Sequence, residues 1–132
     1  QVDGASDSNV FLSLDSGANK FKFVVRNDAG TNNTSITSSI SPSATTWYHI
    51  AGVVSGSNSY LFVNGSTTSG ATGTLSGTRS GTGTNAYLGV NGSGGFRPLN
   101  GYLDDVRITK GYARYTTTFT PPTAAFSNTG PV

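Results

Sequence analysis

Apolar and polar residues alternate along this chain in short segments of strand length. In Lys20–Arg26, the apolar residues Phe21, Phe23 and Val25 fall on one face, and charged residues fall largely on the other. A period of two is typical of a β-strand with one buried face. Val10–Leu14 also alternates, although Phe11 makes one of its faces mixed, and it predicts a strand that is followed by a turn at Asp15–Asn19.

The longest apolar stretch, Thr46–Ser66, predicts two successive hairpins. Trp47–Val54 is rich in β-branched and aromatic residues, and Tyr60–Val63 resumes this composition after a polar Ser-Gly-Ser-Asn turn. Asn64-Gly65 follows at once and is the strongest two-residue hairpin signal, because a type I′ turn needs a positive φ at both central residues. We expect the rest of the chain to form further strands beside this pair.

The remaining segments predict weaker elements. Pro121 and Pro122 prevent regular ladder pairing, so 116–132 is expected to run extended over the surface, held by Phe119 and Phe126. No helical periodicity and no internal repeat is present. We therefore predict an all-β, antiparallel two-sheet β-sandwich, with 1–132 as a single domain and 1–9 as a polar stub. Further strands are expected at Thr34–Ile40, within Ser66–Thr84, at Ala86–Val90 and, most strongly, at Tyr102–Thr109. The expected core comprises Phe21, Phe23, Trp47, Ile50, Val53, Leu61, Val63, Leu88, Val106 and Ile108.

Composition narrows the functional classes. Ser, Thr, Gly and Asn make up half of the 132 residues, yet aromatic residues reach 11%, enough to build a core. The net charge is only +2 and the basic residues are scattered, which argues against a nucleic-acid partner. No apolar run approaches the roughly 18 residues of a membrane span. Cys and Met are absent, and a chain that begins at Gln1 without Met is expected to be processed or part of a longer protein.

Several motifs together resemble the concanavalin A-like lectin/glucanase superfamily, and within it the laminin G-like jelly-roll modules. They are Thr46–Ala51, Val63-Asn64-Gly65, Tyr87-Leu88-Gly89 and Gly101–Ile108. The segments Ile108–Tyr115 and Phe119–Phe126 resemble a version of the module found in bacteriophage tail and virion proteins. The resemblance implies a jelly-roll sandwich. Family members open with one or two additional strands, which Gln1–Asn9 is too short and polar to supply, so these first strands are expected to be missing.

Catalysis is not expected. Glycosidases need two suitably spaced carboxyl groups, about 5–5.5 Å apart in retaining enzymes. The glucanase branch carries a pair of Glu residues on one strand, and this chain has no Glu. His49 is the only histidine, and we interpret it as structural in preference to a member of a catalytic triad or metal site. No catalytic residue is therefore proposed from the sequence.

Binding residues are sought among the loops and aromatic residues. The glycine-rich loop that contains Asn91, Phe96 and Arg97 is the favoured carbohydrate site, because loops carry function on rigid sandwiches. The resemblance implies Asp104 as a ligand of a structural Ca²⁺, but hydrogen bonds to backbone N–H groups or pairing with Arg107 or Arg114 are the favoured alternative. No other cofactor is expected. Five tyrosines are candidates for stacking on sugar rings, with core packing as the preferred reading: Tyr60, Tyr87, Tyr102, Tyr112 and Tyr115.

Two hypotheses for function remain. The leading one is a non-catalytic, lectin-like adhesion module on a phage virion or another extracellular surface, which binds host-surface polysaccharide weakly and multivalently. The alternative is a purely structural virion decoration or fibre domain without a glycan ligand. Because the missing opening strands would leave a sheet edge exposed, we expect a homo-oligomer, or completion of the sandwich by other virion subunits or an upstream part of the polypeptide.

Overall fold

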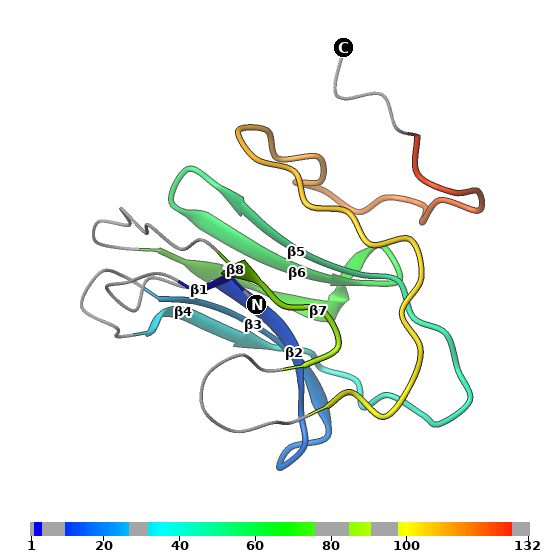
Figure 1. Cartoon of the computed structure of the whole chain (residues 1–132). Coiled ribbons are helices and arrows are strands. Elements are labelled where there is room, and N and C mark those ends of the chain that lie inside the picture. The colour runs from blue at the N-terminus through cyan, green and yellow to red at the C-terminus, as the bar shows by residue number, and fades with distance from the viewer. Residues whose placement is uncertain (1, 4–9, 27–31, 76–84, 91–97, 128–132) are drawn as a thin grey trace.

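Two antiparallel sheets form the molecule (Figure 1). The structure, a computed structural model, describes residues 2–3, 10–26, 32–75, 85–90 and 98–127. The larger sheet has the strand order β4-β3-β2-β1-β8, and the smaller has the order β5-β6-β7. In the described part of the chain, no helix is long and apolar enough to cross a membrane. The predicted all-β, two-sheet sandwich is thus confirmed. The strands are β1 (Val2–Asp3), β2 (Val10–Asp15), β3 (Lys20–Arg26), β4 (Asn32–Thr37), β5 (Ile50–Ser55), β6 (Asn58–Val63), β7 (Ser66–Thr74) and β8 (Asn85–Ala86).

Local sequence sets the two best-defined turns. Asn64 and Gly65 have φ values of 52° and 80° and connect β6 directly to β7, as the Asn-Gly signal predicts. Between β2 and β3, the Asp15 carboxylate accepts hydrogen bonds from the N–H groups of Gly17 and Ala18. The same carboxylate lies 3.1 Å from the ammonium group of Lys22, which holds the pKa of Asp15 below its ordinary value.

The core lies between β3 and β4 on one side and β6 on the other. It contains Phe21, Phe23, Val25, Ile36, Leu61, Val63 and Leu75. Tyr48, Ile50 and Val54 pack against it from the β5 segment. The alternation in β3 therefore correctly predicts its core-facing residues, but it misses Val24 on the opposite face, which is also buried at 1% exposed.

Glycines let the sheets approach each other closely. A Cβ atom at Gly52 would overlap the ring of Phe23, and one at Gly73 would lie 2.7 Å from the hydroxyl oxygen of Thr34. Thr34 also forms a buried hydroxyl contact of 3.1 Å with Ser59. Thus β5 lies over β3, while β6 and β7 lie over β4.

The predicted core is wrong at Trp47, Leu88, Val106 and Ile108, which are all exposed. Trp47 precedes β5, just after a turn in which Thr45 has a φ of 60°. Tyr48 instead packs edge-on against Phe21, with ring centroids 5.2 Å apart. Since successive side chains of extended backbone point to opposite faces, Trp47 then points away from the core.

Four predicted strands also differ from the structure. β4 covers Asn32–Thr37 where a strand at Thr34–Ile40 was expected. β5 begins only at Ile50, and β8 is limited to Asn85–Ala86 where a strand over Ala86–Val90 was expected. Tyr102–Thr109 is not a strand, and Asp105 within it has a φ of 49°, which interrupts regular extended backbone. The predicted polar stub contains β1, a two-residue strand that pairs with β2 and β8.

Replacing Phe23 by Ala should lower the free energy of unfolding by about 3–5 kcal/mol, because it removes a buried ring from the contact between the sheets. Trp47→Ala is the control, since its side chain is 67% exposed, and it should cost less than about 1 kcal/mol. Chemical denaturation of both variants checks this. Equal losses of unfolding free energy in the two variants would contradict the assignment of Phe23 as buried and Trp47 as exposed.

Candidate functional site

The C-terminal segment covers the outer face of the smaller sheet. Phe62 points away from the core, yet it is fully buried because Tyr115 and Phe119 lie against it. The ring centroids of Phe62 and Phe119 are 5.3 Å apart in an edge-on arrangement. Tyr115 and Phe119 stack on each other with centroids 3.6 Å apart. The backbone N–H of Phe119 also donates to the carbonyl of Gly65, which fixes the segment beside the β6–β7 turn.

Arg107 holds this segment together from both sides. Its guanidinium donates a 2.9 Å hydrogen bond to the Tyr115 hydroxyl and lies 3.9 Å from the ring centroid of Phe126. A guanidinium over an aromatic face is attracted by the negative potential of the ring. We call Arg107, Tyr115, Phe119 and Phe126 the tail clamp.

His49 lies beneath the tail clamp. Its ring contacts Phe119 and Tyr115 edge-on, and its Nδ1 atom is buried with no hydrogen-bond partner among the described residues. Burial and, secondarily, the positive charge of Arg107 lower the pKa of His49. Among the described residues, the recorded partners of this ring are Tyr115, Phe119 and the charge of Arg107. The recorded contacts of His49 are packing contacts with aromatic rings, and its structural role stays a prediction.

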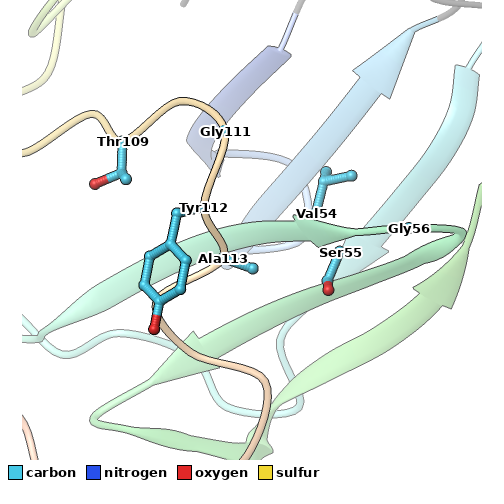
Figure 2. A pocket seen from close by; sticks show the side chains of 7 residues that line it. All are labelled: Val54, Ser55, Gly56, Thr109, Gly111, Tyr112 and Ala113. Atoms are coloured by element: carbon cyan, nitrogen blue, oxygen red, sulfur yellow. The ribbon is translucent and has the colours of Figure 1, made fainter. Parts of the chain in front are cut away.

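A hollow of about 340 Å³ opens between the β5–β6 turn and the segment that follows the clamp arginine (Figure 2). It is lined by Val54, Ser55, Gly56, Thr109, Gly111, Tyr112 and Ala113. Figure 2 shows the side chains of Ser55 and Tyr112 on either side of Ala113. The Tyr112 ring is 57% exposed and so offers an accessible aromatic surface at the hollow.

Local interactions shape the wall of the hollow formed by 109–113. Arg114 donates a 3.1 Å hydrogen bond from Nε to the Thr109 hydroxyl, which closes this stretch into a loop. Gly111 turns the chain with a φ of 85°, and Gly56 turns the opposite wall with a φ of 57°. Both values lie in the left-handed region that glycine enters without steric cost.

The hollow combines two chemical features. Tyr112 supplies an exposed ring, and Ser55 and Thr109 supply hydroxyl groups that donate and accept hydrogen bonds. Val54 and Ala113 provide apolar surface between them. The hollow has the size at which small-molecule sites begin, about 300 Å³. Such a lining suits a neutral, polyhydroxylated ligand with an apolar ring face.

The predicted site residues have different outcomes. Asn91, Phe96 and Arg97 lie outside the described residues, so the carbohydrate site proposed there stays a prediction. Asp104 is exposed, and its carboxylate accepts a 2.9 Å hydrogen bond from the N–H of Asp105. Within the described ranges, no three His, Asp or Glu side chains gather into a group that could hold a metal ion. The calcium role of Asp104 stays a prediction.

The aromatic candidates separate into two groups. Tyr102 and Tyr112 are exposed, at 87% and 57%, whereas Tyr60 stacks on Phe62 and Tyr115 belongs to the tail clamp. The preferred interpretation of the tyrosines as core residues is therefore wrong for Tyr102 and Tyr112. The sequence also did not indicate that Tyr112 lies beside the turn at Ser55-Gly56. The signal that could have found them is the pair of turn glycines, Gly56 and Gly111, beside hydroxyl and aromatic residues.

Comparison with known protein families gives one match. A family model of laminin G type, described as the concanavalin A-like lectin/glucanases superfamily, matches residues 1–114. Comparisons with curated proteins and with solved structures give no match. The matched range includes every residue that lines the hollow, because the last of these residues is Ala113.

Protonation of His49 should destabilise the fold. Because the folded-state pKa lies below the ordinary value of 6.5, the unfolded chain binds more protons below that pH. The free energy of unfolding should therefore fall as the pH drops below 6.5. His49→Gln should remove the part of this pH dependence that comes from the imidazole. The NMR titration of the single imidazole provides a direct check, and Arg107→Gln should raise its pKa. A pKa above 6.5 in the folded protein would contradict this account.

Proposed function

The chain belongs to the concanavalin A-like lectin/glucanases superfamily, and from this premise we propose that it is a non-catalytic carbohydrate-binding module. The observation that carries the proposal is the exposed Tyr112 ring beside the hydroxyl groups of Ser55 and Thr109. A pyranose presents an apolar C–H face that stacks on an aromatic ring, while its hydroxyls exchange hydrogen bonds with neighbouring hydroxyl groups. Tyrosine is suited to this combination because its ring is apolar and its tip is polar.

The ligand class follows from the charges of the hollow. None of the lining residues is ionisable except Tyr112, so electrostatic selection for an acidic or basic ligand has no basis there. A neutral sugar unit of a larger glycan is the occupant that fits. The hollow is shallow and contacts one ring, so we expect weak binding that becomes effective only when several copies are displayed together.

The absence of catalysis is part of the proposal. The superfamily includes glucanases as well as lectins, and the argument against hydrolysis is that the chain contains no Glu. The hollow also contains no Asp or His among its lining residues. General acid–base hydrolysis of a glycoside needs two carboxyl groups that flank the scissile bond.

We place the module on a phage virion or another extracellular surface. The support is the resemblance of Ile108–Tyr115 and Phe119–Phe126 to modules of phage tail and virion proteins, together with a composition rich in Ser, Thr, Gly and Asn. A structural fibre or decoration role is the second candidate. It is favoured by the exposed apolar residues of β2 and of the segment around Val106.

Tyr112→Ala should weaken glycan binding by about tenfold, because stacking on the ring supplies most of the contact. Tyr102→Ala is the matched control, since Tyr102 is more exposed and does not line the hollow, and it should leave binding unchanged. Screening immobilised neutral glycans and then titrating a hit by NMR provides the measurement. Binding that survives Tyr112→Ala would place the site elsewhere, and release of reducing sugar would refute the non-catalytic assignment.

A further inference from the structure

The tail clamp closes the base of the loop that forms one wall of the hollow. This wall runs from Thr109 to Ala113 (Figure 2), and clamp residues flank it in the chain, Arg107 before it and Tyr115 after it. The 2.9 Å hydrogen bond from the Arg107 guanidinium to the Tyr115 hydroxyl joins the two ends of the loop. The position of the wall therefore depends on where the clamp lies on the smaller sheet.

Aromatic contacts hold the clamp on this sheet. Tyr115 and Phe119 pack edge-on against Phe62 and against His49. Among the described residues, the one backbone–backbone hydrogen bond recorded for 107–127 runs from the N–H of Phe119 to the carbonyl of Gly65. A segment with so few backbone hydrogen bonds opens at a lower free energy than the strands beneath it.

His49 is anchored on the opposite side of these contacts. Its N–H donates a 3.0 Å hydrogen bond to the side-chain oxygen of Asn64, and its carbonyl accepts a 2.8 Å hydrogen bond from the N–H of Asn64. Asn64 belongs to the turn between β6 and β7, so these bonds fix the backbone of His49 to the smaller sheet. If the imidazole and the clamp repel each other, the clamp is the partner that can move.

Protonation of His49 creates such a repulsion. An imidazolium carries a proton on both nitrogens, and the Nδ1 atom of His49 is buried without a hydrogen-bond partner among the described residues. Burial, followed by the positive charge of Arg107, lowers the pKa of His49. The other titratable neighbour is Tyr115, whose hydroxyl accepts from Arg107, while Phe119 and Asn64 carry no titratable group. The closed clamp therefore disfavours the imidazolium through both an unpaired buried donor and a like charge.

We propose that His49 is an acid-sensitive latch: protonation of its imidazole releases the tail clamp from the smaller sheet and opens the hollow, while the two sheets stay folded. Release exposes the imidazolium to water and separates it from Arg107. Because the pKa of His49 is lowered in the closed form and ordinary in the open form, opening increases as the pH falls below 6.5 and reverses as it rises. Resting on the proposed function, the latch weakens glycan binding in acid.

Amide hydrogen exchange tests the latch without any ligand. Between about pH 7.5 and about pH 5, the range in which an imidazole titrates, the protection factor of the Phe119 N–H should fall severalfold. The N–H of Leu75, which donates to the carbonyl of Ser57, is the internal reference and should keep its protection. Equal losses at Phe119 and Leu75 would show global unfolding and overturn the local latch, as would unchanged protection at Phe119.

Two variants at the latch separate the imidazole from other acid effects. His49→Phe keeps an aromatic ring against Phe119 and Tyr115 but cannot be protonated, and His49→Gln removes the ring as well as the charge. In both variants the protection of Phe119 should no longer depend on pH, and circular dichroism verifies that each one folds. Acid-induced opening that persists in His49→Phe would refute the role of the imidazole.

The distance across the hollow gives a second readout. The protein has no cysteine, so spin labels can be attached at Asn58→Cys and Lys110→Cys alone. Both residues are exposed and outside the lining, one beside the β5–β6 turn and the other in the 109–113 loop. Electron spin resonance should find a longer, broader distance distribution in acid, and no such change with His49→Phe. An unchanged distance in acid would contradict opening of the hollow. Failure to bind glycans would remove the proposed function but would not alter these two readouts.

Discussion

The contact between Phe23 and Gly52 is the constraint on which the rest of the molecule depends. The ring of Phe23 occupies the space where a side chain at Gly52 would stand, so the two sheets meet closely at β3 and β5. This contact fixes where the smaller sheet lies over the larger one. It also decides which apolar residues are buried, because β3 is covered completely and β2 is not.

The outer face of the smaller sheet then determines where ligands can bind. With Leu61 and Val63 in the core, their neighbour Phe62 must point outward, and the tail clamp covers it. The clamp leaves the loop 109–113 beside the β5–β6 turn, and the hollow lies between them. The candidate site is therefore a consequence of how the C-terminal segment packs, and it does not depend on an inserted domain.

Local patterns in the sequence predict those strands and turns whose conformation depends on residues close together in the chain. The alternation of Lys20–Arg26 gives β3 and its buried face, and Asn64-Gly65 gives the β6–β7 turn, because both signals act over a few residues. Trp47, Val106 and Ile108 are apolar but exposed, since their burial depends on which distant segment covers them. Tyr112 could not be selected from five tyrosines for the same reason: its role depends on a turn more than fifty residues earlier in the chain.

The most direct test of this account is the free energy of unfolding of Gly52→Ala. The added methyl group should overlap the Phe23 ring and cost about 1–3 kcal/mol. Gly101→Ala should cost less, because its nearest neighbour, a carbon of Leu99, is 3.9 Å from the new Cβ. In combination with Phe23→Leu, the cost of Gly52→Ala should fall well below its value alone, as expected for residues in contact. If Gly52→Ala is no more destabilising than Gly101→Ala, or if the two substitutions at the contact are additive, the sheets do not depend on this contact.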